Sequence, residues 1–154
     1  MQTQGRQSDC PPIEVLLAED SPSDVFLTKE ALKRVKTAVH LSVVTDGVEA
    51  MSFLHRQGKY AGQPRPNLIL LDLNMPRKDG REVLAEIKSD KQLRYIPVIV
   101  LTSSSAEQDL LTAYGSHANC YLVKPATFAE FEKMFESLES FWLKTVTLPP
   151  YEHS

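Results

Sequence analysis

The sequence has little of what defines several large classes of protein. It contains two cysteines, four histidines and one tryptophan in 154 residues. Two cysteines cannot form the disulfide framework of a small secreted domain, and no two histidines have the spacing of a zinc site. No apolar run approaches the roughly 20 residues that a membrane-spanning helix needs, and the first residues lack the apolar stretch of a signal peptide. We therefore expect a cytoplasmic protein that does not bind a membrane.

An excess of positive charge is also missing. The formal net charge is -3 and the isoelectric point is about 5.8. Proteins that bind nucleic acid usually carry a basic face, so we expect no nucleic-acid partner. Apolar residues make up 42% of the chain and charged residues 24%, which is the mixture of an ordinary globular protein. The length fits one domain.

Short apolar runs alternate with amphipathic stretches along the chain. Some of the apolar runs are continuous, which is typical of strands buried on both faces. Alternation of this kind predicts an α/β fold of the flavodoxin-like type, a doubly wound five-stranded parallel sheet with helices on both faces. The predicted strands are 13–18, 41–44, 68–73, 97–101 and 120–123. The predicted helices follow Ser21-Pro22 and Asp46-Gly47, follow Asp79-Gly80, cover 106–114, and run from Thr127 to about Leu143.

Residues outside this pattern suggest a division of the chain. Residues 1–12 are polar and end in Pro-Pro, which predicts a flexible leader. The domain itself is expected to span 13–143. Residues 144–154 form a C-terminal extension, of which 144–148 alternates in polarity and could add a strand.

Polar residues stand where the predicted strands end. Glu19 and Asp20 follow the first strand, Asp72 lies near the end of the third, Thr102 follows the fourth and Lys124 follows the fifth. The carboxyl ends of parallel strands meet at one edge of the sheet, where ligands bind in such folds. We therefore expect these five side chains to share one cleft.

The three carboxylates of this cleft would repel one another unless a cation joined them. Mg²⁺ accepts oxygen ligands and keeps several waters, so it suits the set. Asp72 interrupts an otherwise apolar strand, where a carboxylate without partners is costly, and a carboxylate can attack phosphorus as a nucleophile. Lys124 supplies the opposite charge. Taken singly, each residue has a plainer interpretation: an acidic first helical turn for Glu19-Asp20, an ion pair for Lys124, a loop cap for Thr102.

The motifs around these residues resemble those of bacterial response-regulator receiver domains. The segment Leu70-Leu71-Asp72-Leu73-Asn74-Met75-Pro76 with Asp79-Gly80 is similar to the phosphoacceptor signature of that family. The acidic pair Glu19-Asp20, the strand end Leu101-Thr102-Ser103 and the dipeptide Lys124-Pro125 match the other signatures in the same order. The resemblance covers about residues 13–143.

The resemblance implies a role for each matching residue. Asp72 would accept a phosphoryl group from a histidine kinase. Asp20, Asp72 and the backbone carbonyl of Asn74 would bind Mg²⁺, with Glu19 acting mainly through water.

The same resemblance implies a conformational switch. Lys124 would contact the phosphoryl group, Thr102 would move toward it, and Tyr121 would follow as the aromatic half of the switch. Pro125 would form a cis peptide bond that aims Lys124 into the site.

Other segments resemble the small regulators that partner bacterial phytochrome kinases. These are residues 60–67, residues 79–88 and the end Glu139-Ser140-Phe141-Trp142-Leu143. That subfamily implies a homodimer formed through the C-terminal extension. Phe141, Trp142 and Leu143 form an apolar cluster that would either lie in the dimer interface or fold back on its own domain.

Three other functions fit the pattern less well. An aspartyl-phosphate phosphatase would carry a second aspartate where Asn74 stands. A flavin-binding module would need a loop rich in glycine, serine and threonine after the first strand, where Glu19-Asp20 is acidic. A receiver-like domain that only binds partners would not need Asp72, Thr102 and Lys124 together. No length remains for a DNA-binding effector domain, so we expect the output to pass through protein contacts.

Overall fold

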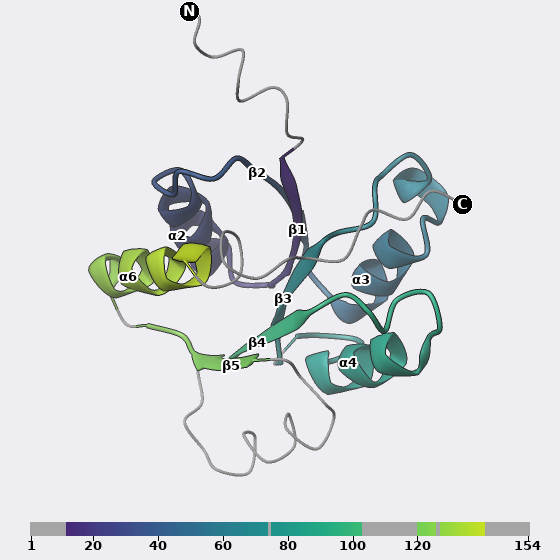
Figure 1. Ribbon diagram of the computed structural model, residues 1–154. Coiled ribbons are helices and arrows are strands. Elements are labelled where there is room, and N and C mark those ends of the chain that lie inside the picture. Colours follow the sequence, from purple (N-terminus) through teal and green to yellow (C-terminus); the bar gives the residue numbers. More distant parts are fainter. Residues whose placement is uncertain (1–11, 74, 103–119, 126, 141–154) are drawn as a thin grey trace, which may run out of the picture.

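The computed structural model describes residues 12–73, 75–102, 120–125 and 127–140 (Figure 1). Five parallel strands form one sheet in the order β2-β1-β3-β4-β5. The strands are β1 (Ile13–Ala18), β2 (Val39–Val44), β3 (Leu68–Asp72), β4 (Val98–Thr102) and β5 (Cys120–Val123), and the helices are α2 (Pro22–Leu32), α3 (Gly47–Leu54), α4 (Gly80–Ser89) and α6 (Phe128–Leu138), with a short 3-10 helix η1 (Gly58–Tyr60). The predicted doubly wound parallel sheet is confirmed.

Most element boundaries lie within one or two residues of the predicted ones, but α6 ends at Leu138, whereas the last helix was predicted to run to about Leu143. β2 begins at Val39, two residues earlier than expected, and β3 ends at Asp72 rather than Leu73. The stretch Gln57–Pro66, which looks like a plain loop in the sequence, contains η1. The expected helix at 106–114, most of the leader and the expected strand at 144–148 lie outside the described residues.

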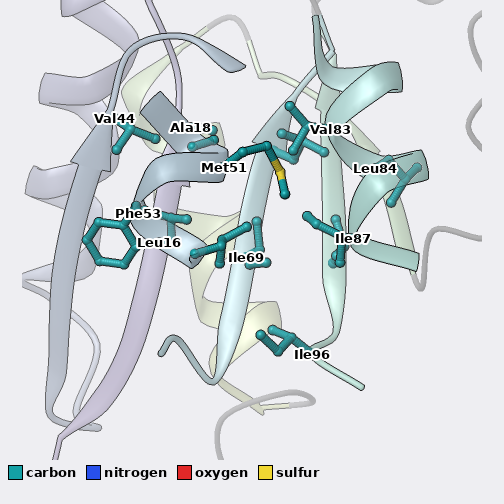
Figure 2. Close-up of a cluster of buried hydrophobic side chains, with 14 of the residues drawn as sticks. Leu16, Ala18, Val44, Met51, Phe53, Ile69, Val83, Leu84, Ile87 and Ile96 are labelled. Carbon is teal, nitrogen blue, oxygen red and sulfur yellow. The ribbon is translucent and has the colours of Figure 1, made fainter. Parts of the chain in front are cut away.

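Each of the central strands sends alternate side chains to opposite faces of the sheet, because the side-chain period of a strand is two residues. In β3, Ile69 and Leu71 belong to one apolar cluster and Leu68 and Leu70 to the other. The first cluster contains residues of α3 and α4, and Figure 2 shows Met51, Val83, Leu84 and Ile87 within it. The second cluster contains residues of α2 and α6, which lie together on the other face (Figure 1). All five residues of β3 are buried, which explains its continuous apolar run.

The register brings the carboxyl ends of the strands to one edge of the sheet. Ala18 of β1 pairs with Leu71 of β3, Asp72 pairs with Leu101 of β4, and Thr102 pairs with Val123 of β5. The register therefore places Glu19 beside Asp72 and brings Thr102 and Lys124 to the same edge.

Side-chain caps begin the helices near that edge. Ser21, Asp46, Asp79 and Thr127 each accept a hydrogen bond from the backbone N–H three residues later. The predicted starts at Ser21-Pro22 and Thr127 are confirmed, whereas Asp46, predicted as part of a turn, caps α3. Among the described helices, none is long and apolar enough to cross a membrane.

Two glycines allow backbone segments to approach closely beneath the edge. A Cβ atom on Gly47 would lie 1.9 Å from the carbonyl oxygen of Lys78, and one on Gly80 would lie 2.3 Å from the carbonyl oxygen of Asp72. The loop between β3 and α4 is therefore packed directly against the start of α3. Only glycine fits at either contact.

Replacement of Gly47 by alanine should destabilise the fold, because the new methyl group meets backbone rather than a flexible side chain. We expect the free energy of unfolding in urea to fall by about 2 kcal/mol or more. Gly62→Ala is the matched control, since nothing lies within 4 Å of its added Cβ. That variant should be as stable as the wild type or up to about 1 kcal/mol more stable. Equal stability of the two variants would contradict the close packing at Gly47.

Candidate functional site

Three carboxylates meet at the edge of the sheet. Glu19 and Asp20 follow β1 and Asp72 ends β3, and one carboxylate oxygen from each lies within 4.8 Å of the others. Glu19 is 1% exposed and Asp72 is 3% exposed, whereas Asp20 is exposed to solvent. Two buried carboxylates so close together require a compensating positive charge.

Lys124 provides positive charge to this group. Its ammonium nitrogen lies 2.6 Å from Oε1 of Glu19, 2.9 Å from Oδ2 of Asp24 and 3.6 Å from Oδ2 of Asp72. The side chain is only 9% exposed. The predicted pairing of Lys124 with Asp72 is present, but the ammonium lies closer to the other two carboxylates.

The pKa values of Glu19 and Lys124 reflect burial and this contact. Burial raises the pKa of Glu19 to about 7, and the charge of Asp72 adds to the rise, while the hydrogen bond from Lys124 acts against it. Burial on its own would lower the pKa of Lys124, but hydrogen bonds to Glu19 and Asp24 and the charge of Asp72 raise it above its ordinary value. Lys124 is therefore charged at neutral pH, and Glu19 titrates near neutrality.

Thr102 lies on β4, the strand next to that of Asp72, and Tyr121 lies on β5, the strand beyond β4. Thr102 ends β4 and is fully buried, and its carbonyl oxygen accepts a 2.7 Å hydrogen bond from the backbone N–H of Lys124. This bond ties the end of β4 to the start of the loop that carries Lys124. Tyr121 of β5 packs against the apolar cluster on the side of α3 and α4.

The prediction of a cis peptide bond before Pro125 was wrong. No cis peptide bond occurs in the described ranges, so the bond between Lys124 and Pro125 is trans. The trans form is the more stable one for a peptide bond before proline, and Lys124 reaches its partners without the cis form. Asn74 and residues 141–143 lie outside the described part of the chain. Their expected roles in metal binding and in a dimer interface therefore stay predictions.

The loop after Asp72 is held at several points. The N–H of Gly80 donates a 2.9 Å hydrogen bond to the carbonyl oxygen of Leu73. Arg77 lies in the left-handed region with φ 66°, and its guanidinium donates a hydrogen bond to Oδ2 of Asp46. A residue other than glycine costs roughly 1–2 kcal/mol in that conformation, so this ion pair helps to hold an unfavourable backbone.

The sequence did not indicate two of these ion pairs, that of Asp24 with Lys124 and that of Asp46 with Arg77. Asp24 looks in the sequence like an ordinary acidic residue of a first helical turn, and only the fold brings it to Lys124, 100 residues away. Asp46 belongs to an Asp-Gly pair that predicts a turn, and nothing nearby in the sequence points to Arg77. The predicted helix start at Ser21-Pro22 indicates where Asp24 lies on α2, but not which residue it pairs with.

The donor set suits a hard divalent cation. Its ligands are carboxylate oxygens, which Mg²⁺, Mn²⁺ and Ca²⁺ prefer. One of the three, Asp20, faces solvent, which leaves a route for a hydrated ion. A cation here would also stabilise the negatively charged form of Glu19, which burial makes unfavourable.

Comparison with known proteins agrees with this site. A sequence model described as the response regulator receiver domain matches residues 15–136. The response regulator Rcp1 of Synechocystis sp. is 53% identical over 139 residues, which are 90% of this chain and 95% of Rcp1.

Solved structures show the same similarity. The phosphorylated cyanobacterial phytochrome response regulator RcpA superposes with a TM-score of 0.87 at 46% identity, over 91% of this chain and all of the other. The Mn²⁺-bound form of Rcp1 superposes with a TM-score of 0.85 at 52% identity, over 90% of this chain and all of the other.

Replacement of Glu19 by glutamine should change how stability depends on pH in EDTA. The folded protein binds the Glu19 proton with a pKa of about 7, against an ordinary value of 4.5. Between these values the folded state holds more proton than the unfolded state, so the contribution of Glu19 to stability is lost as pH rises from about 4.5 to 7. Glu19→Gln removes this loss.

The stability of Glu19→Gln relative to the wild type should therefore increase across that window, by on the order of 2 kcal/mol, and stay level above pH 8. Urea unfolding at pH 5, 6, 7 and 8 measures the difference. Titrating groups that do not contact Glu19 are common to both proteins and cancel. A difference that does not vary with pH would mean that Glu19 titrates normally.

Proposed function

Because the chain belongs to the response regulator receiver domain family, we propose that it accepts a phosphoryl group on Asp72 from a histidine kinase. It is a signalling protein rather than a metabolic enzyme. The observation that supports Asp72 as the acceptor is its place in the carboxylate cluster. It is a buried carboxylate at the end of β3, 3.6 Å from the ammonium of Lys124.

The reaction proposed for Asp72 is a displacement at phosphorus. A carboxylate oxygen of Asp72 forms a bond to phosphorus while the bond from phosphorus to a nitrogen of the kinase histidine breaks. The imidazole nitrogen keeps the electron pair of the broken bond. The product is an aspartyl phosphate, which this chain is proposed to hydrolyse slowly.

Glu19, Asp20 and Asp72 would hold Mg²⁺ in this reaction, together with the carbonyl of Asn74. Three carboxylate donors so close together, one of them open to solvent, support this assignment. When bound, the ion supplies positive charge against the charge of the phosphoryl oxygens. Glu19 would act mainly through water, which fits its direct contact with Lys124.

Lys124, Thr102 and Tyr121 would convert phosphorylation into a change of shape. A phosphoryl group of about −2 charge gives the ammonium of Lys124 and the hydroxyl of Thr102 a new acceptor. Movement of Thr102 would leave space for Tyr121 on the neighbouring strand. The changed surface would then act through protein contacts.

The proposed phosphoryl donor is a phytochrome-type histidine kinase. RcpA, described as a cyanobacterial phytochrome response regulator, is 46% identical in sequence to this chain. Rcp1 is covered over 95% of its length. We also propose a homodimer whose interface includes Phe141, Trp142 and Leu143.

Acetyl phosphate with Mg²⁺ should phosphorylate the wild-type protein, and Asp72→Asn should remain unmodified. Intact mass spectrometry measures the gain of one phosphoryl group. Asp90→Asn is a matched control, because it removes an acid at the other end of α4 and should react like the wild type. Modification of Asp72→Asn would place the acceptor elsewhere.

The same proteins test the donor. An autophosphorylated phytochrome-type kinase should transfer label to the wild type and to Asp90→Asn, but not to Asp72→Asn. A protein that reacts with acetyl phosphate but with no such kinase would retain the acceptor site and contradict the proposed donor.

A chain that ends after Ser140 should sediment as a monomer, whereas the full chain should sediment as a dimer. The reason is that the truncated chain lacks the apolar cluster of the extension. Trp142→Ala in the full chain should weaken the dimer in the same direction. A truncated chain that remains a dimer would place the interface elsewhere.

A further inference from the structure

We propose that Asp24 is a positioning residue for Lys124. Its carboxylate holds the ammonium beside Asp72 without letting it close onto Asp72. Asp24 thereby sets how much of this positive charge is available to the phosphoryl group. The inference rests on the proposed role of Asp72 as phosphoryl acceptor. It assigns a function to a residue outside the carboxylate triad, by which we mean Glu19, Asp20 and Asp72.

The distances show how the ammonium is divided among its partners. Nζ of Lys124 lies 2.9 Å from Asp24, which is a charge-assisted hydrogen bond. It lies 3.6 Å from Asp72, which is beyond hydrogen-bond distance although still an ion pair. Asp72 therefore lies near the positive charge without being the closest partner of the ammonium.

Asp24 differs from the other two partners of Lys124 because it is not one of the carboxylates that could bind a cation. Glu19 and Asp72 both belong to the triad whose oxygens lie within 4.8 Å of one another, and Asp24 does not. A divalent ion at the triad would draw on the charge of Glu19 and Asp72. Asp24 is then the carboxylate that remains to hold Lys124.

The local structure fixes Asp24 in this position. Asp24 is the third residue of α2, and its backbone N–H donates to Oγ of Ser21. The backbone N–H of Ser21 in turn donates to Oε2 of Glu19. One turn of chain therefore sets both of the carboxylates that contact Lys124 most closely. The side chain of Asp24 is 27% exposed and that of Lys124 is 9% exposed, so water screens the pair less than it would a surface pair.

A plain interpretation of Asp24 is that it only stabilises α2. An acidic residue in the first turn interacts favourably with the helix dipole. On that interpretation its loss lowers stability and changes nothing at the triad. The two interpretations therefore predict different results for metal binding.

Loss of the Asp24 charge should weaken Mg²⁺ binding for two reasons that act in the same direction. The ammonium no longer has a carboxylate outside the triad, so it closes onto Asp72 and competes with the ion. One negative charge near the ion is also lost. Asp24→Asn should raise the dissociation constant of Mg²⁺ about three- to tenfold, measured by titration calorimetry on the unphosphorylated protein.

The phosphorylated protein should respond as well. With Asp24 neutral, the ammonium is shared with no other carboxylate outside the triad and stays on the phosphoryl group. The half-life of the phosphoryl group in saturating Mg²⁺ should lengthen several-fold in Asp24→Asn. Asp24→Glu, which keeps the charge, should restore both values to within about twofold of the wild type.

Glu30→Gln is the matched control. Glu30 lies on the same helix and pairs with the exposed Lys33, away from the triad. Its loss should leave the Mg²⁺ affinity within about twofold of the wild type, because salt screens distant charges.

A double-mutant cycle separates the route through Lys124 from simple loss of charge. In a Lys124→Gln background, Asp24→Asn should change the Mg²⁺ affinity at least about threefold less than it does in the wild type. Additive effects would overturn the inference, as would an Asp24→Asn protein that only melts earlier. A wild-type protein that is not phosphorylated at all would instead reject the proposed function of Asp72.

Discussion

The ammonium group of Lys124 lies between 2.6 and 3.6 Å from three carboxylates, and the arrangement at the sheet edge depends on this contact. Glu19 and Asp72 are almost fully buried, where an uncompensated charge would be expensive. The ammonium makes their burial tolerable and still leaves the triad with a net negative charge. A site of this kind attracts a cation, and it holds an ammonium ready for the charge that a phosphoryl group would bring.

The sheet decides which side chains can take part. Glu19, Asp72 and Lys124 follow strand residues whose alternation places them on the face that α2 covers. Thr102 continues the alternation of Val98 and Val100, which face the side of α3 and α4. The site therefore draws its charges from one face and borders the other through Thr102. Through the buried Thr102, a change at the charged face can reach the layer of α3 and α4 on the opposite face.

Much of this could be predicted from the sequence. Continuous apolar runs indicated the buried strands, and polar residues at their ends indicated the triad and Lys124. Two features could not be predicted, for physical reasons. The pair between Asp24 and Lys124 depends on where α2 lies, which local patterns do not encode. The left-handed conformation of Arg77 depends on a tertiary contact with Asp46. The trans bond before Pro125 is the form that is ordinarily more stable, and the expectation of a cis bond, drawn from resemblance alone, was wrong.

The close approach of Gly47 to Lys78 has a consequence for the length of the loop after Asp72. Gly80 contacts Asp72 and Leu73 and so joins the two ends of this loop, and Lys78, shortly before Gly80, contacts Gly47. Both anchors are backbone contacts, so a different side chain cannot replace them. One residue inserted between Asp72 and Gly80 would move at least one anchor out of place. The spacing of this segment is therefore under tighter constraint than most of its side chains, and a loop of another length would require a different start to α3.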